Sequence, residues 1–170
     1  MKNYFLLTLM TLILGSFNTY SQKNSNEVST FYLIRHAEKD RSNPENRDPV
    51  LNQEGMARAL KWASVFEDVV FDRIYTTDYK RTRQTAAPTA VKNNMDVLVY
   101  DPRTIDVNGL KKDTMGKTVL IVGHSNTTPM LANKLLGAEK YPQMDDADNA
   151  SLYIITIINS HVTSTVLKID

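Results

Sequence analysis

The 170-residue sequence contains no cysteine, which excludes disulfide bonds, thiolate metal ligands and a cysteine nucleophile. The fold must therefore be stabilised by its hydrophobic core alone. Net charge is almost absent as well, because 20 lysines and arginines stand against 19 aspartates and glutamates, giving +1. A chain this close to neutrality has no overall basic field with which to attract nucleic acid or an anionic membrane. Neither is an expected partner.

Long apolar stretches are missing except for one near the start. Lys2 precedes an apolar run from Tyr4 to Leu14, and several small or polar residues follow through Ser21. This order is typical of a secretory signal peptide, and the run falls short of the roughly 20 apolar residues of a transmembrane helix. An ordinary buried first strand or helix is the alternative interpretation.

We therefore expect residues 1–21 to be a cleaved signal peptide. Residues 22–170 would then form an exported domain, periplasmic or extracellular, with no stable membrane anchor. Loss of Lys2 with the leader brings the formal charge from +1 to 0.

Hydrophobic patterning divides the rest of the chain into alternating strands and helices. Short apolar runs predict strands, whereas apolar residues at helical spacing, such as Met56, Ala59, Leu60 and Ala63, predict helices. Pro88 is expected to kink or shorten the helix that contains it. The expected strands are Ser29–Ile34, Phe71–Thr76, Val97–Tyr100, Val119–Gly123, Ser151–Ile158 and Val162–Ile169, and the expected helices are Gln53–Phe66, Tyr79–Asn93 and Thr127–Leu136.

Strands that alternate with helices predict an α/β fold, in which helices cover both faces of a mostly parallel sheet. The last two expected strands are separated only by Asn159, Ser160 and His161, a spacing typical of a hairpin. We therefore expect one three-layer α/β/α domain whose sheet has an antiparallel edge. The chain length suits one domain, and no internal boundary is visible in the composition.

Chemically capable residues follow several of the expected strands. Arg35 and His36 come directly after the first strand, Arg81 lies at the start of the helix after the second, and His124 follows the fourth. In open α/β sheets, ligands bind beyond the carboxyl ends of the strands. These side chains should therefore converge at one edge, together with a carboxylate from the segment after the third strand, where Asp101 and Asp106 lie.

Such a set suits the transfer of a phosphoryl group. Arginine binds phosphate oxygens through a planar fork that stays charged. A neutral histidine can attack phosphorus and form a covalent intermediate, a second histidine can donate a hydrogen bond, and a carboxylic acid can protonate the leaving oxygen. Catalysis of this kind consists mainly of positioning and charge stabilisation.

A metal site is the rival interpretation of two histidines. His36 and His124 lie 88 residues apart, without the local spacing that metal ligands usually show, and flanking arginines would repel a cation. Asp145, Asp146 and Asp148 form an acidic cluster without the glycine and bidentate glutamate of a calcium loop. We expect no metal and no other cofactor.

Four segments of the chain resemble the histidine phosphatase superfamily, which includes cofactor-dependent phosphoglycerate mutases and small phosphohistidine phosphatases. They occur in the family's order, and together with the strands around them they span most of residues 29–158. The segments are LIRHAEK at Leu33–Lys39, DPVLNQEG at Asp48–Gly55, IYTTDYKRTRQTA at Ile74–Ala86 and VLIVGHSN at Val119–Asn126.

The resemblance implies a role for each matching residue. His36 corresponds to the phosphorylated nucleophile, Arg35 and Arg81 to the two phosphate-binding arginines, and His124 to the second histidine. Ala37 stands where the family usually has glycine after the histidine, a difference that we expect the fold to tolerate.

The proton donor is less well defined. The family often has a glutamate after the third strand, in stretches such as YDERLREI, and YDPRTIDV at Tyr100–Val107 places Asp106 at the corresponding position. An aspartate is one methylene shorter than glutamate, so Glu38 and Asp101 stay open as alternatives. The charges of Lys39, Arg41, Arg83 and Arg103 are expected to be mainly solvated.

The connection from Asp101 to Lys117 is short, whereas larger family members insert a helical lid there. An open pocket favours hydrolysis over mutase activity, because a mutase must shelter the transferred group from water. We therefore expect an exported, metal-independent phosphatase that acts on phosphomonoesters or related groups of a small molecule or a macromolecule.

Two other functions stay open. One is a non-catalytic module that binds phosphate or a phosphosugar. The other is an intracellular mutase-like enzyme or phosphohistidine phosphatase whose first residues are not a leader. Neither the substrate nor the oligomeric state follows from the sequence.

Overall fold

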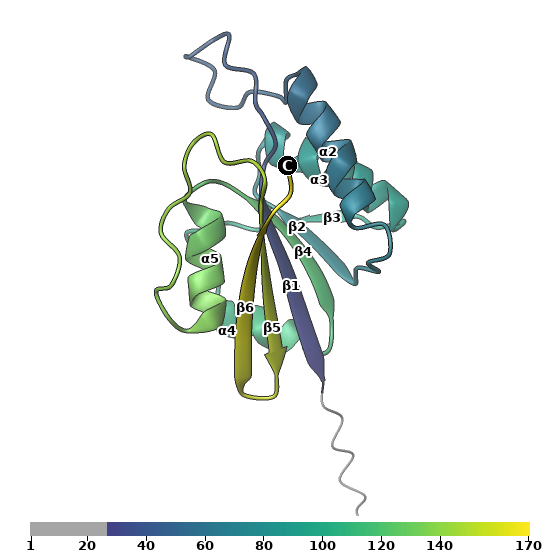
Figure 1. Cartoon of the computed structure of the whole chain (residues 1–170), viewed down its shortest axis with the longest axis vertical. Coiled ribbons are helices and arrows are strands. Elements are labelled where there is room, and N and C mark those ends of the chain that lie inside the picture. Colours follow the sequence, from purple (N-terminus) through teal and green to yellow (C-terminus); the bar gives the residue numbers. More distant parts are fainter. Residues whose placement is uncertain (1–26) are drawn as a thin grey trace, which may run out of the picture.

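The computed structural model describes residues 27–170, in which six strands form one sheet that is flanked by helices (Figure 1). The expected signal peptide, residues 1–21, lies outside the described residues. Within the described part, no helix combines the length and apolar character needed to cross a bilayer. The elements are β1 (Val28–Arg35), α2 (Gln53–Val65), β2 (Arg73–Thr76), α3 (Lys80–Lys92), β3 (Val97–Val99), α4 (Val107–Asp113), β4 (Thr118–Gly123), α5 (Thr127–Leu136), β5 (Ser151–Ile158) and β6 (His161–Lys168).

The sheet has the strand order β3-β2-β4-β1-β5-β6. Its first four strands are parallel, and the β5–β6 hairpin adds two antiparallel strands next to β1. The register pairs Arg35 at the end of β1 with Gly123 at the end of β4, so the residues that follow these strands emerge side by side. The expected α/β sheet with an antiparallel edge is confirmed.

Alternating residues of the central strands supply two hydrophobic layers. Phe31 and Leu33 of β1 pack in a cluster with α4 and α5, whereas Ile34 packs in a second cluster with Trp62 of α2 and Ala86 of α3. Successive side chains of a strand point to opposite faces, so the two clusters lie on opposite sides of the sheet. Figure 1 shows α5 on one side of the sheet and α2 and α3 on the other.

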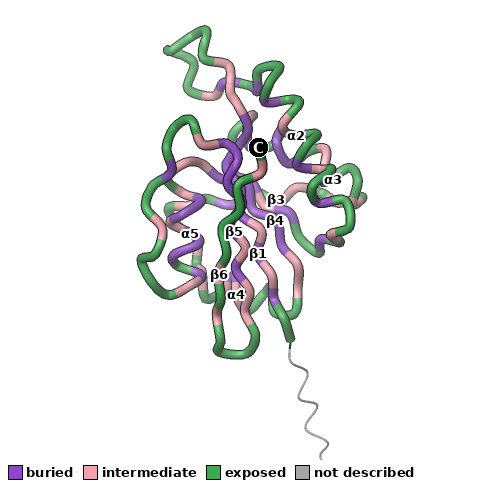
Figure 2. Tube along the Cα trace, in the orientation of Figure 1, coloured by how far each residue is buried: buried purple, intermediate pink, exposed green. Residues whose placement is uncertain are grey.

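Burial is greatest in the middle of the sheet, as Figure 2 shows. Trp62 is stacked on Phe66, which meets Phe71 and Tyr32 edge-on, and the first three of these are almost completely buried. Burying one large apolar side chain stabilises the fold by about 1.5–3 kcal/mol. This core holds β1, β2 and β4 in register and therefore fixes the backbone from which the candidate site residues project.

The structure differs from the sequence expectation at two helices. Helix α4 was not expected, because seven residues with a single buried apolar side chain, Leu110, show no helical periodicity. Helix α3 runs through Pro88 to Lys92, so the proline does not shorten it. The missing N–H of a proline removes one helical hydrogen bond, and packing of Ala86 and Ala90 against the core holds the helix together across that position.

The polar segment before α2 is tied to the strand end that carries His36. Lys39 and Leu51 form an isolated antiparallel bridge, and the Asn52 side chain caps α2 by accepting a hydrogen bond from Gly55 N. A Cβ at Gly55 would lie 2.1 Å from the carbonyl oxygen of Glu38, so only glycine fits this approach. The DPVLNQEG segment thus holds the loop after β1 in place.

Candidate active site

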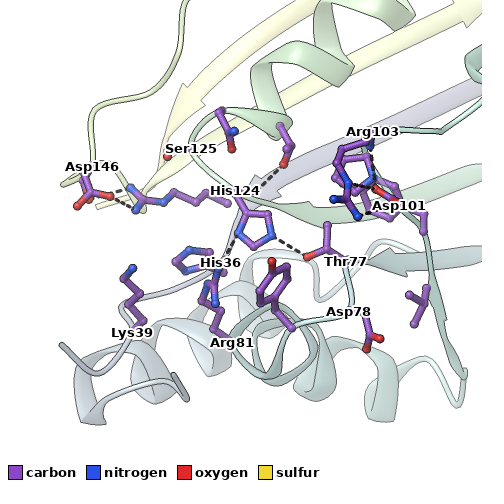
Figure 3. A pocket seen from close by; sticks show the side chains of 17 residues that line it. His36, Lys39, Thr77, Asp78, Arg81, Asp101, Arg103, His124, Ser125 and Asp146 are labelled. Carbon is purple, nitrogen blue, oxygen red and sulfur yellow. Dashed lines mark hydrogen bonds and ion pairs between the residues drawn. The ribbon is translucent and has the colours of Figure 1, made fainter. Parts of the chain in front are cut away.

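Four of the five predicted site residues line one cavity at the carboxyl ends of the parallel strands. Arg35, His36, Arg81 and His124 all border this cavity, whose volume is about 700 Å³. Figure 3 shows His36, His124 and Arg81 close together, with Asp101 and Arg103 to one side and Lys39 and Asp146 to the other. The fifth predicted residue, Asp106, is not part of this group.

His36 is held by hydrogen bonds of both its backbone and its ring. Its backbone N–H donates to the carbonyl of Gly123 at 2.9 Å, and its backbone carbonyl accepts from Asn149 Nδ2 at 2.7 Å. Nδ1 lies 2.7 Å from the carbonyl oxygen of Ala37. A carbonyl can only accept, so Nδ1 carries the proton and the neutral ring keeps its lone pair on Nε2.

The surroundings of His36 keep the imidazole neutral. Burial, followed in effect by the positive charges of Arg35 and Arg81, lowers its pKa to about 3, although the hydrogen bond to Ala37 acts in the opposite direction. An uncharged ring with a free lone pair is the form in which histidine attacks an electrophile. At neutral pH His36 is therefore a competent nucleophile.

His124 faces His36, with 5.4 Å between the ring centroids. Its Nε2 lies 2.8 Å from the hydroxyl of Thr77, which in turn donates to Thr82 Oγ1 at 3.2 Å. Its Nδ1 lies 3.4 Å from a terminal nitrogen of Arg81, which can only donate. Nε2 therefore carries the proton, and burial together with Arg81 and Arg35 lowers the pKa of His124 to about 4.

Arg81 lines the cavity with a positive charge, and two of its side-chain nitrogens have no hydrogen-bond partner among the described residues. Its guanidinium lies over the ring of Tyr79 at 4.3 Å, and Nη1 is 3.8 Å from Asp48 Oδ1, too far for a hydrogen bond. Nε and Nη1 are buried without a hydrogen-bond partner in the described structure. Buried donors without partners are costly, so the geometry favours an anion that would accept from them.

Arg35 is only 2% exposed and is anchored by one loop. Nη1 donates to the carbonyls of Asp145, Asp146 and Asp148, and Nη2 donates to the Asp146 carboxylate at 2.7 Å. The other carboxylate oxygen of Asp146 accepts from Arg41 at 2.7 Å. Nε of Arg35 has no partner in the described structure and stays available as a donor.

One threonine connects the loop after β1 to the helix that carries Arg81. The hydroxyl of Thr85 accepts from Ala37 N at 2.9 Å and donates to the carbonyl of Arg81 at 2.7 Å. Ala37 itself does not adopt a positive φ, and it is fully buried beside Leu51 and Ala59. Its methyl group therefore fits where the family usually has glycine.

The structure does not bring Asp106 to the cavity. Its carboxylate accepts from Asn108 N at 3.0 Å and caps the N-terminus of α4, a local bond that aspartate forms readily. The geometry therefore gives no support to Asp106 as the proton donor.

The two alternative proton donors are each paired with an arginine. Asp101 lines the cavity, and hydrogen bonds from the neighbouring Arg103 lower its pKa. Glu38 pairs with Arg58 at 2.6 Å and lines the adjacent cavity instead.

Sequence reasoning did not assign site positions to Lys39 and Tyr79, although both line the cavity with the histidines. The ring of Tyr79 meets that of His124 edge-on, with 5.1 Å between the centroids, and packs against the guanidinium of Arg81. The sequence could have indicated Tyr79 as a site residue, because it stands two positions before Arg81. Among residues 27–170, no group of three or more His, Asp or Glu side chains is arranged to hold a metal ion.

Comparison with known proteins finds one matching family model. Residues 31–108, which include Arg35, His36 and Arg81, match the model of the histidine phosphatase superfamily (branch 1). This match covers a little less than half of the chain and confirms the resemblance expected from the sequence. No curated protein sequence matches it.

Solved structures of this superfamily share the fold. The protein histidine phosphatase SixA in complex with tungstate is 16% identical, with a TM-score of 0.67 over 82% of this chain and 96% of that one. Phosphoglycerate mutase from Bacillus anthracis is 15% identical, with a TM-score of 0.65 over 84% and 93%. A phosphoserine phosphatase mutant from Entamoeba histolytica is 16% identical, with a TM-score of 0.61 over 81% and 95%. At these identities the likeness concerns the fold.

The protonation of the two histidines gives a direct test of this site. In the anion-free protein both imidazoles should be neutral at about pH 5.5, because their pKa values lie near 3 and 4. Saturating inorganic phosphate should raise the pKa of His124, since a bound anion offsets the repulsion from Arg81 and Arg35. Nitrogen NMR of the His161→Gln variant, which leaves only these two imidazoles, would measure both effects. A half-protonated ring near pH 6.5 without phosphate would contradict the geometry.

Proposed function

We propose that this protein is a phosphatase that transfers a phosphoryl group to Nε2 of His36 and then to water, without a metal ion. The observation that carries the proposal is the free lone pair of a buried, neutral His36 beside the unused donors of Arg81. Transfer of a phosphoryl group needs both a nucleophile and hydrogen-bond donors for the equatorial oxygens.

In the first step, Nε2 of His36 attacks phosphorus. The Nε2–P bond forms while the bond from phosphorus to the leaving oxygen breaks, and the electron pair departs with that oxygen. Arg81 and Nε of Arg35 donate to the equatorial oxygens as they gather charge. The proton on Nδ1 stays bonded to the Ala37 carbonyl, which stabilises the ring as it becomes positive on phosphorylation.

In the second step, water attacks the phosphohistidine. The new P–O bond forms, the P–N bond breaks and its electron pair returns to Nε2, while the proton of the water passes to solvent or phosphate. Within residues 27–170, only α4 and its short flanking segments lie between β3 and β4, so no large helical insertion separates these strands. Ready access of water favours hydrolysis over return of the group to a product.

The substrate would be a phosphorylated small molecule or an exposed phosphorylated group of a macromolecule, since an open cavity admits both. Export to the periplasm or the outside is part of the proposal and rests on the order of residues in Lys2–Ser21. A structure of SixA with tungstate, a tetrahedral oxyanion like phosphate, is consistent with anion binding on this fold.

A non-catalytic phosphate-binding module is the second candidate. It is favoured by one observation, namely that the cavity carboxylates Asp101 and Asp146 are engaged by arginines and are not free acids. Such a module would bind phosphate but form no covalent intermediate.

The decisive experiment is to trap the intermediate in excess chelator. During turnover of p-nitrophenyl phosphate, acid-labile and base-stable phosphate should appear on the peptide that contains His36, and nitrophenol release should be unaffected by EDTA. A His161→Gln variant should give the same labelling, because His161 is exposed in the distant β5–β6 turn. Binding of phosphate without labelling or release would favour the binding module, and full inhibition by EDTA would contradict the metal-independent mechanism.

A further inference from the structure

The carboxylates that line the cavity with both histidines are each paired with an arginine. Asp78 pairs with Arg83 at 2.8 Å and Asp101 with Arg103 at 3.0 Å. Asp146 contacts both Arg35 and Arg41 at 2.7 Å. Asp78, Asp101 and Asp146 are the acidic residues of this cavity among residues 27–170.

This pairing opposes proton donation to a leaving group. Hydrogen bonds from Arg103 lower the pKa of Asp101, and the hydrogen bond from Arg41 lowers that of Asp146. A carboxylate that is held ionised cannot act as a general acid, a role worth about 10²- to 10⁴-fold in rate. An alkoxide is a strong base and leaves slowly without a proton, whereas a phosphate oxyanion is a weak base and needs none.

Lys39 is a cation beside His36 that forms no ion pair with any residue in 27–170. It is one of four residues, with Arg35, His36 and Asp146, that line both neighbouring cavities. Its ammonium group makes no hydrogen bond or ion pair with a described residue, because the carboxylate of Asp146 is shared by the two arginines. Burial and the charges of Arg41 and Arg81 lower the pKa of Lys39, an effect that a bound anion would offset.

The position of Lys39 suits a second anionic group. Figure 3 shows it beside His36, on the side away from the Asp101–Arg103 pair. Arg81 and Nε of Arg35 have unused donors for a phosphoryl group at His36. Lys39 is therefore available to the group on the other side of the bond that breaks. A terminal phosphate next to a second phosphate matches this arrangement of charges.

We infer that the site is specific for phosphoanhydrides, with the terminal phosphoryl group on His36 and the departing phosphate on Lys39. The inference rests on the proposed phosphatase function and names its substrate class. In the reaction, Nε2 of His36 displaces the bridging oxygen, which leaves with its electron pair as part of a phosphate anion. Water then cleaves the phosphohistidine, so one anhydride and one water give two phosphates, with no external acid or co-reactant.

The test compares three substrates with the purified protein in excess EDTA. Inorganic pyrophosphate represents the anhydride, p-nitrophenyl phosphate an ester with a weakly basic leaving group, and glycerol 2-phosphate an alkyl ester. We expect kcat/KM for pyrophosphate to exceed that for glycerol 2-phosphate by at least about 100-fold, since no acid assists the alkoxide. Glycerol 2-phosphate within tenfold of pyrophosphate would overturn the inference.

A substitution at Lys39 separates its proposed role from a general loss of charge. Lys39→Gln should lower kcat/KM for pyrophosphate about tenfold more than for p-nitrophenyl phosphate, because a charged hydrogen bond to the second phosphate is lost. Lys134→Gln, an exposed lysine in the last turn of α5, should change neither substrate. An equal loss for both substrates in Lys39→Gln, or a larger loss for glycerol 2-phosphate, would overturn the inference, the latter by showing that Lys39 donates a proton.

The outcomes for the two proposals are distinguishable. Turnover of p-nitrophenyl phosphate that depends on His36, without cleavage of pyrophosphate, would overturn the phosphoanhydride assignment and leave the phosphatase proposal standing. No cleavage of any of the three would overturn both.

Discussion

Replacing His36 by alanine should lower kcat for p-nitrophenyl phosphate by at least about 10⁴-fold. The variant loses the attacking Nε2 lone pair, and the neighbouring His124 cannot substitute for it. Nε2 of His124 is hydrogen-bonded to the Thr77 hydroxyl and Nδ1 faces Arg81, so these two partners fix the orientation of the ring. Residual turnover would have to come from direct attack of water on a phosphate that the arginines still hold.

The measurement is steady-state release of nitrophenol together with the search for the phosphorylated peptide. His36→Gln should be as inactive as His36→Ala while retaining a polar side chain for the buried Ala37 carbonyl, so that loss of folding can be told apart from loss of chemistry. Thermal unfolding of each variant provides that check. Unchanged nitrophenol release in His36→Ala would end the proposal of a histidine nucleophile.

Replacing Arg81 by methionine should lower kcat/KM for the same substrate by about 10²- to 10³-fold, with most of the loss in kcat. Two buried nitrogens of Arg81 lack a partner, and we expect them to donate to a group that carries more charge in the transition state than in the bound substrate. Methionine replaces the aliphatic part of the arginine side chain and is flexible enough to pack against the Tyr79 ring, so the variant removes the charge while filling much of the space.

Two further variants make the Arg81 test specific. Arg81→Lys should recover only part of the activity, because an ammonium cannot bind two oxygens through a planar fork. Arg83→Met, on the same helix but half-exposed and paired with Asp78, should stay within about threefold of the parent protein. A loss in Arg81→Met no larger than in Arg83→Met would remove Arg81 from the mechanism.

The sequence is most informative where one local rule governs the structure. The apolar runs before His36 and before His124 predicted the central strands β1 and β4. Because these strands are parallel, their carboxyl ends predicted where His36 and His124 would meet. Arg81 was placed correctly because it lies one residue inside α3, directly after the turn that follows β2. The positions of these four residues follow from the order of strands and helices, which the sequence pattern is sufficient to define.

The sequence is less informative where a side chain has competing partners. Asp106 was expected to reach the cavity, but an aspartate before a short helix has a nearby backbone N–H to cap, and that local bond prevails. The binding of Arg35 by residues 145–148, more than 100 positions away, has no local signature at all. Lys39 was expected to be a solvated charge, but it lies between two cavities. This place depends on the paths of loops, which no periodicity in the sequence predicts.

The position of β1 in the sheet also determines when the protein can first work. This strand ends directly before His36, and both of its neighbours, β4 and β5, come from the last third of the chain. While the chain folds, β1 lacks both neighbouring strands and His36 lacks the facing His124 until residues as late as 158 take part. Distant pairings of this kind also slow folding. Catalytic competence should therefore arrive in one step at the end of folding, and incomplete chains should be inert towards phosphorylated compounds.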